Sequence, residues 1–388
     1  MRVFLLYMLL AGLLAQSSPA ATKKQAGVVS LDVCAKGNRV DLLIAQASAD
    51  APTQLQYLRS DDGGATFLEP VPLGKDQPPP EPVHRGMDAQ IASNEDDLVA
   101  VWTTEANTRF RRGPLACAIS SDGGKTWKPG GDPSDDRQIS DHAFVDLAAD
   151  ARGMFHCVWL DGRTGAGKGL RYSRSTDGGV TWSKNQTLIP ATCECCWNKI
   201  EIGPDGTIYI LYRAKAPRDM AIICSDDGGL TWSPPVTVGA FDWQIDGCPH
   251  VGGGLAISSI GGKRVVHAVV WTANGKPDKG AFVLSSNDAG MTWSKPIQLG
   301  TPQSWHPDIA CRGNDVVAVW DVFEETDTVA YFIRSRDGGK SWSKPEKLCE
   351  GLAGYPKMVT TESGFRVFWT AKVESGKVEW KSRAISKD

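Results

Sequence analysis

Short apolar runs recur along the chain at similar intervals, and most of them end in an aromatic residue. Each run is continuous, and turn-forming residues such as Gly, Asn and Asp lie just before it. Continuous apolar runs of this length between turn residues predict strands. Seven of the runs take the same place in a repeated unit: Val40–Ala45, Leu98–Trp102, Phe155–Trp159, Ile208–Tyr212, Val265–Trp271, Val316–Trp320 and Phe365–Thr370.

Each unit predicts further strands around its apolar run. An inner strand comes first, as at 88–92 and 146–149, and a third strand leads into an eight-residue phrase, Ser-x-Asp-x-Gly-x-Thr-aromatic. A short fourth strand follows the phrase. The last unit, Tyr355–Ile385, has an apolar run but no phrase.

The phrase occurs six times, and its aspartates lie 49 to 61 residues apart. A period near fifty residues is typical of a propeller or a solenoid. We therefore predict an all-β fold, a single β-propeller of seven units of which six carry the phrase, with six blades as the alternative. The aspartates of the phrase are Asp62, Asp122, Asp177, Asp227, Asp288 and Asp337.

The phrase has the composition of a rigid turn. Gly64 and its equivalents tolerate positive φ, and Asp62 and its equivalents can accept hydrogen bonds from nearby amides. The closing aromatic residue restarts a strand. A catalytic group is needed once rather than six times, so we interpret these aspartates as structural.

The phrase resembles the Asp box, or BNR repeat, of the sialidase (neuraminidase) superfamily. The resemblance covers nearly everything after the first twenty or so residues. It implies a β-propeller, usually of six blades, with the boxes on the face away from the active site. Fold alone does not imply sialidase activity.

The unit layout predicts which loops share a rim. Loops from strand four to the next strand one, and from strand two to strand three, lie on one rim, and the boxes lie on the other. Function is expected on the first rim, where loops converge on the axis. Residues of reactive type gather before the inner strands: His84, Arg85, His142, Cys193, Cys195, Cys196, Cys248, His250, His306 and Tyr355.

Three interpretations of the cysteines and histidines compete. They can pack structurally, with a disulfide such as Cys195–Cys248. They can bind a metal, because thiolate and imidazole are the usual ligands of Zn and Cu. A cysteine can also be redox-active or catalytic. The predicted metal ligands are His84, His142, Cys193, Cys195, Cys196, Cys248, His250 and His306.

The sialidase resemblance also implies catalytic residues. Sialidases bind the substrate carboxylate with arginines and use a tyrosine nucleophile, with an aspartate as acid/base. The stretch from Glu201 to Arg213, with Arg218 beyond it, resembles the segment that bears the second arginine. The loops on the same rim are rich in charge and include Arg109, Arg111 and Arg112. The predicted catalytic set is Arg85, Arg213, Arg218, Asp219 and Tyr355.

This set implies a pocket for a carbohydrate or another anionic small ligand, in an exo-sialidase-like glycoside hydrolase. Cysteines, however, occupy the segment expected to hold the glutamate partner of the tyrosine. The alternative is therefore a non-enzymatic propeller that binds Cu, Zn or a partner through its Cys/His residues.

Composition and the N-terminal residues indicate which partners and which location to expect for this protein. The chain has 388 residues with 41 Gly, 23 Pro and a net charge of −3, so no nucleic-acid partner is expected, and we expect a monomer. Residues 1–20 have a basic start, an apolar stretch too short for a comfortable membrane span, and Ser18-Pro19-Ala20 before a cleavage point. We predict a Sec signal peptide at 1–20, and a periplasmic or secreted propeller domain at 21–388.

Overall fold

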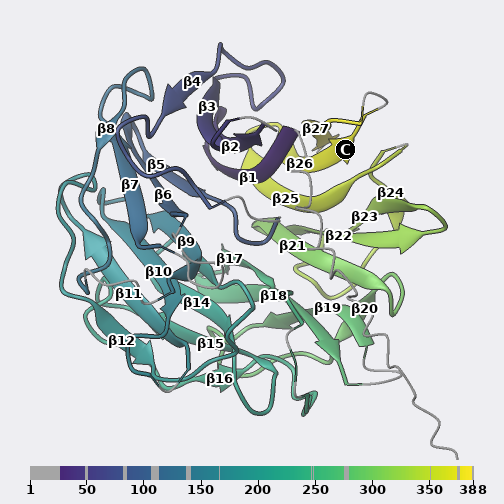
Figure 1. Ribbon diagram of the computed structural model, residues 1–388. Coiled ribbons are helices and arrows are strands. Elements are labelled where there is room, and N and C mark those ends of the chain that lie inside the picture. The colour runs from purple at the N-terminus through teal and green to yellow at the C-terminus, as the bar shows by residue number, and fades with distance from the viewer. Residues whose placement is uncertain are drawn as a thin grey trace, which may run out of the picture.

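The fold is a closed ring of antiparallel sheets (Figure 1), seen in a computed structural model. The structure describes residues 27–48, 51–81, 85–105, 113–136, 141–165, 167–245, 247, 249–274, 279–349, 351–373 and 376–386. Within them lie strands that group into seven consecutive blades. No long apolar helix that could cross a membrane occurs in this part of the chain.

Strands of the first four blades are β1 (Gly27–Lys36), β2 (Arg39–Ala47), β3 (Gln54–Ser60) and β4 (Val71–Leu73); β5 (Gln90–Asn94), β6 (Asp97–Thr103), β7 (Leu115–Ser120) and β8 (Lys128–Pro129); β9 (Ala143–Ala149), β10 (Phe155–Asp161), β11 (Gly169–Ser175) and β12 (Gln186–Ile189); β13 (Lys199–Ile202), β14 (Ile208–Arg213), β15 (Met220–Ser225) and β16 (Val236–Thr237). Those of the last three are β17 (Gly254–Ile260), β18 (Lys263–Ala273), β19 (Lys279–Ser286) and β20 (Ile297–Leu299); β21 (Ser304–Arg312), β22 (Asp315–Glu324), β23 (Asp327–Ser335) and β24 (Glu346–Lys347); β25 (Gly354–Thr361), β26 (Gly364–Lys372) and β27 (Val378–Ser386).

Hydrogen bonding divides the described strands into five sheets of four strands and one of seven, β25-β26-β27-β1-β2-β3-β4. The larger sheet is two blades joined by a single parallel bridge, Gly27 to Val378. All seven inner strands, β1, β5, β9, β13, β17, β21 and β25, line one central channel. The described ring therefore has seven blades, the last of three strands, although only six sheets are separately hydrogen-bonded. The predicted all-β propeller is confirmed, and each predicted apolar run is the second strand of a blade.

The apolar runs are continuous because each second strand is covered on both faces. In β6, Leu98, Ala100 and Trp102 pack toward blade 1, whereas Val99 and Val101 pack toward blade 3. Successive side chains of a strand point to opposite faces, so a strand between two neighbours needs apolar residues at every position. The core is thus a set of apolar layers between adjacent blades.

The Asp boxes are turns, as the sequence predicts. Ser175 is buried, accepts a bond from the Gly179 amide at 2.8 Å and donates to Asp177 at 2.8 Å. Asp177 in turn accepts from the amide and hydroxyl of Thr181 at 2.8 and 2.6 Å. These bonds to the charged form lower the pKa of Asp177 despite the opposing effect of burial.

The boxes and the functional rim lie at opposite ends of the strands. Gly63 and Gly123 of two boxes donate to Asn38 and Asp96, in the turns between strands one and two. At the other end, Cys193 before β13 donates to the carbonyl of Arg213 at the end of β14. The two rims are therefore distinct in the described residues.

We predict that Ser175→Ala lowers the free energy of unfolding by about 1–2 kcal/mol, because the buried Gly179 amide loses its acceptor. Denaturant unfolding measures this change. Ser363→Ala, at an exposed serine, is the control and should change stability by much less. If both substitutions lowered stability equally, the hydrogen bonds of the box would have no special stabilising role.

Candidate functional site: the channel mouth and a thiol cluster

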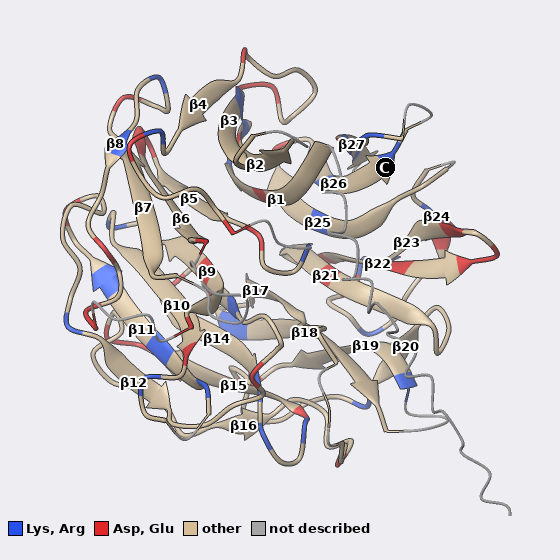
Figure 2. Ribbon diagram, in the orientation of Figure 1, with Lys and Arg blue, Asp and Glu red and all other residues tan. Residues whose placement is uncertain are grey.

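A central channel of about 400 Å³ is lined by residues of all seven inner strands. Charged residues of both signs line it, and Figure 2 shows acidic and basic positions interspersed around the ring. The charged lining residues are Asp32, Arg85, Asp88, Asp146, Lys199, Glu201, Asp308 and Lys357.

Several of these carboxylates hold neighbouring blades together. Asp88, Asp146 and Asp308 accept the backbone amides of Leu31, Ile200 and Met358 at 3.0, 2.7 and 2.8 Å. Each of these amides belongs to the inner strand of an adjacent blade. The aspartates therefore replace the backbone ladder that the inner strands of adjacent blades lack.

Lysines and carboxylates of neighbouring inner strands are paired in the channel. Lys357 Nζ lies 2.8 Å from Asp32 Oδ1, and Lys199 Nζ lies 3.6 Å from Asp146 Oδ2. Burial, with Asp146 and Asp308 nearby, raises the pKa of Glu201 from its ordinary value of 4.5 to about 7, against the lowering effect of Lys199. The channel thus holds one carboxyl group that titrates near neutrality.

Three aromatic side chains form a row at the channel mouth. The ring of His306 stacks on that of Tyr355 with centroids 3.7 Å apart, and Trp197 lies 6.0 Å from His306 on a near-parallel plane. His306 and Tyr355 have φ values of 43° and 53°. Both lie where the register with the second strand shifts, so bulges set their unusual backbone and aim their side chains.

Asp321 fixes the orientation of both residues. His306 Nδ1 lies 2.8 Å from each carboxylate oxygen, and the Tyr355 amide donates to Oδ2 at 2.7 Å. The Asp321 carboxyl is buried. The sequence analysis missed this residue as a site component, although it pairs with Trp305, next to His306, and so follows from the strand register.

Arg85 lies behind the aromatic row. Its Nε donates to Asp88 at 2.8 Å, and its Nη atoms reach Thr370 Oγ1 and the Tyr355 carbonyl at 3.1 and 3.3 Å. Its guanidinium lies 5.4 Å from the centroid of the Tyr355 ring. The predicted pair Arg85 and Tyr355 is therefore brought together, with Arg85 buried and supporting Tyr355.

A second cluster contains three cysteines of the turn before β13. Cys193 Sγ lies 3.6 Å from Cys195 Sγ and 3.6 Å from Cys196 Sγ, and all three sulfurs lie within 4.8 Å of one another. All three residues are buried. The distances are too long for disulfide bonds, whose sulfurs lie about 2.05 Å apart. Cys248, the predicted disulfide partner, lies outside the described residues.

Arginine side chains border this thiol cluster. Arg218 Nη1 lies 3.0 Å from Cys193 Sγ. Hydrogen bonds with Cys195 and Cys196, helped by the charge of Arg213, lower the pKa of Cys193. Burial raises the pKa of Cys196 to about 11. Of these two sulfurs, that of Cys193 thus carries negative charge more readily.

Arg213 and Asp219 hold backbone groups. Arg213 is 1% exposed and donates to the carbonyls of Arg218, Val251 and Trp271 at 2.6, 3.1 and 2.8 Å. Asp219 accepts the amides of Asp242 and Trp243 at 2.8 and 3.2 Å. These contacts place Arg213 inside the protein, away from the channel lining, so it does not join Arg85 in one carboxylate-binding set.

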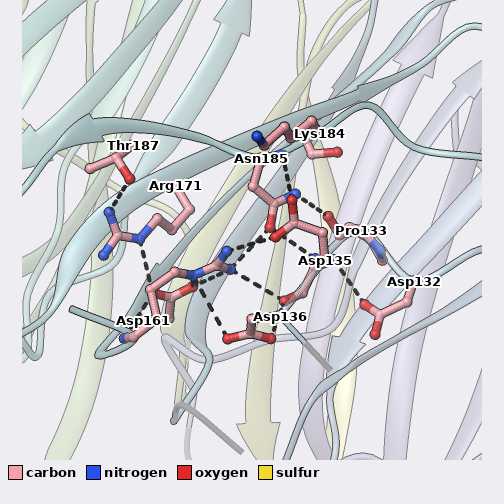
Figure 3. Close-up of polar contacts among 12 residues, drawn as sticks. Asp132, Pro133, Asp135, Asp136, Asp161, Arg171, Lys184, Asn185 and Thr187 are labelled. Carbon is pink, nitrogen blue, oxygen red and sulfur yellow. Dashed lines mark hydrogen bonds and ion pairs between the residues drawn. The ribbon is translucent and has the colours of Figure 1, made fainter. Parts of the chain in front are cut away.

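His142 belongs to a separate ion-pair network. Figure 3 shows the part of this network around Asp136, Asp161 and Arg171. Its Nε2 lies 2.8 Å from Ser134 Oγ and 3.3 Å from Asp136 Oδ1. Asp161 nearby accepts bonds from Arg163 and Arg171 at 2.8 and 2.9 Å. The arginines neutralise these carboxylates, so the group is an ion-pair network rather than an open cation site.

Among the described residues, the predicted metal ligands do not gather in one shared site. Cysteines gather at one place, while His142 joins Asp136 and Asp161, and His306 joins Asp321. His250 is exposed at the rim with a φ of 52°. His142 and His306 are each engaged by a nearby carboxylate, of Asp136 and Asp321, rather than by the cysteines. His84, Cys248, Arg109, Arg111 and Arg112 lie outside the described residues.

Comparison with known proteins agrees with this architecture. The BNR/Asp-box repeat profile matches residues 118–129, which include one box. The chain is an Asp-box β-propeller. Curated protein sequences yield no match to it.

Solved structures share the fold at low identity. A PL25 ulvan lyase bound to -[GlcA(1-4)Rha3S]- is 10% identical, covers 94% of this chain and 97% of its own, and gives a TM-score of 0.58. A protein of unknown function from Dyadobacter fermentans DSM 18053 is 16% identical over 81% of this chain and 96% of its own, with a TM-score of 0.52. Trypanosoma rangeli sialidase is 14% identical over 80% of this chain, with a TM-score of 0.52, and the match spans 55% of that sialidase. At these identities the likeness shows the fold alone.

We predict that Arg213→Met destabilises the protein by about 3 kcal/mol or more, because buried carbonyls lose their donors. Thermal or denaturant unfolding measures the loss. Arg336→Met, at an exposed arginine of an Asp box, is the matched control and should have a small effect. Unchanged stability in Arg213→Met would contradict the structural role of this guanidinium.

We predict that Glu201 makes stability fall as pH rises from about 4.5 to about 7. Its pKa is higher in the folded than in the unfolded protein, so the folded state binds more protons in this window. Glu201→Gln should flatten the fall, as measured by denaturant unfolding at several pH values. Glu379→Gln, at an exposed carboxylate, should leave the pH profile as it is.

Proposed function

We propose that this propeller binds an acidic carbohydrate at the channel mouth and acts on it by acid–base catalysis. His306 is the proton acceptor and Tyr355 the proton donor. The single observation that carries the proposal is the Asp321–His306 pair with the Tyr355 ring stacked on it, beside a channel of about 400 Å³.

His306 has the surroundings of a general base. Asp321 accepts a hydrogen bond from Nδ1–H of His306, and this tautomer leaves the lone pair on Nε2. A buried carboxylate on one imidazole nitrogen fixes the tautomer and stabilises the imidazolium that forms when the other nitrogen takes a proton. Positioned proton transfer of this kind contributes about 10²–10⁴-fold to a rate.

Tyr355 has the surroundings of an acid. Burial, and then the charge of Asp321, raises the pKa of its hydroxyl. The phenol therefore keeps its proton and can give it to a leaving group or a developing oxyanion. The same shift disfavours the phenolate nucleophile that the sialidase resemblance implies.

An acidic sugar suits this position on two grounds. The aromatic row of Trp197, His306 and Tyr355 offers flat faces beside the channel, and Lys199, which pairs with Asp146, keeps 32% of its side chain exposed within the channel, where it can also contact a ligand carboxylate. Two propellers of the same fold are described with acidic sugars, the ulvan lyase with a GlcA-containing unit and the sialidase with sialic acid. Arg213 is occupied by carbonyls, which favours His306 chemistry over an arginine-triad mechanism.

The proposed setting is outside the cytoplasm. The predicted signal peptide at residues 1–20 would deliver the chain to the periplasm or the medium, where extracellular polysaccharides are accessible.

The test uses the mature chain with ulvan, a sialylated glycan and neutral dextran. We expect binding of an acidic glycan by calorimetry, and turnover that is lower by about 10²–10⁴-fold in His306→Asn and Tyr355→Phe while affinity changes little. Product analysis separates elimination, which gives an unsaturated uronate that absorbs ultraviolet light, from hydrolysis, which gives only a new reducing end.

Tyr331→Phe is the matched control, since this hydroxyl lies on β23 and contacts Glu324 outside the channel. It should retain activity. Asp321→Asn should lower activity and shift the pH profile of kcat, because His306 loses its anionic partner. Full turnover in folded His306→Asn, or no binding of any acidic glycan, would refute the proposal.

A further inference from the structure

We propose that Cys193, Cys195 and Cys196 form a three-sulfur site for one Cu(I) ion. The site lies in the turn before β13 and is separate from the proposed sugar site, since none of the three residues lines the channel. It therefore goes beyond the proposed function and does not depend on it.

The sulfur spacing fits a single ion. Two sulfurs that each lie about 2.3 Å from one tetrahedral ion are about 3.8 Å apart, and they are slightly farther apart around a trigonal ion. The two Sγ–Sγ distances from Cys193 are 3.6 Å, and the third pair lies within 4.8 Å. Small side-chain rotations are enough to bring all three sulfurs to bonding distance.

Hydrogen bonds to neighbouring segments fix the turn that carries the three cysteines. The Cys193 amide donates to the Arg213 carbonyl at 3.0 Å, and the Thr192 amide donates to the Lys168 carbonyl at 2.8 Å. The three cysteines pack with Met87, Ala143 and Phe144 from other blades. A preformed ligand set lowers the ordering cost of binding.

The charge around the sulfurs favours thiolates. Arg218 Nη1 contacts Cys193 Sγ at 3.0 Å, and the Arg213 guanidinium is buried in the same region. Among the described residues, no carboxylate lies within 4.0 Å of an Arg213 nitrogen, and its Nε has no hydrogen-bond partner. A buried cation is costly without an opposite charge nearby, and a thiolate cluster supplies one.

The ligand count selects Cu(I) over Zn(II). Structural zinc sites are almost always four-coordinate, and three-ligand zinc sites keep water in an open fourth position. Here the described residues place three sulfurs together with no histidine or carboxylate, and all three are buried. Soft thiolates bind Cu(I) as well as Zn, and Cu(I) is satisfied by two or three sulfur ligands without a water in an open position.

The experiment uses the mature full chain, reduced and handled without oxygen. Cu(I) is supplied as its complex with the chelator bathocuproine disulfonate. We expect one Cu(I) per chain by elemental analysis, a thiolate-to-copper ultraviolet band, and retention against the chelator. Cys193→Ser/Cys195→Ser/Cys196→Ser should weaken Cu(I) binding at least about 100-fold, since the ligands are lost.

Cys224→Ser is the matched control, at a cysteine of β15 outside the cluster, and should bind Cu(I) as the parent does. Circular dichroism shows whether the triple variant folds. If it does not, the single variant Cys196→Ser is used in its place. Arg218→Met should weaken binding about 10–100-fold, because the cluster loses a neighbouring charge.

Three results would overturn the proposal. One is a folded, fully reduced parent protein that takes up no Cu(I). Another is equal Cu(I) binding by the cysteine variants and the parent. The third is a site that binds Zn(II) and rejects Cu(I). In each case the three thiols would be structural, or would serve another metal.

Discussion

The ring depends on hydrogen bonds that inner-strand backbone amides donate to carboxylates of neighbouring blades. Among the residues that the structure describes, adjacent blades share no backbone ladder apart from the single bridge from Gly27 to Val378. Asp88, Asp146 and Asp308 each accept an amide of an adjacent inner strand instead. Ionised carboxylates are the stronger acceptors of these bonds, but around a narrow channel they repel one another. Lys199 and Lys357 offset the repulsion by pairing with Asp146 and Asp32. The charged residues of the channel thus serve, before any other role, to join neighbouring blades into a closed ring.

The same constraint shapes what the channel mouth can do. Bulges at the start of β21 and β25 turn His306 and Tyr355 out of the strand ladder, and Asp321 at the end of the neighbouring second strand binds both. Arg85 is neutralised by Asp88, so it supports Tyr355 rather than binding a ligand carboxylate alone. An acid and a base are therefore held side by side by groups that also stabilise the fold.

The thiol cluster follows a different principle, because its neighbours are cations rather than carboxylates. Arg213 crosses from blade 4 to the carbonyls of Val251 and Trp271 and leaves a buried positive charge near Cys193. Arg218 adds a second cation in direct contact. Trp197 follows Cys196 directly, packs over Gly86 and lies against His306. The thiol cluster and the aromatic row at the channel mouth are therefore neighbours in the structure, although they share no proposed ligand residue.

The sequence by itself determined the strands, the seven repeated units, the box turns and the gathering of Cys193, Cys195 and Cys196. These features are local, since an apolar run between turn residues forms a strand and three cysteines in four residues cannot lie far apart. Tertiary structure decided which hydrogen-bond and ion-pair partners each reactive side chain has. Arg213 lost its expected ligand role to carbonyls of blade 5, and His142 joined Asp136 and Asp161 instead of the cysteines. Such partners come from segments far apart in the chain, and only the closure of the ring brings them within hydrogen-bonding distance.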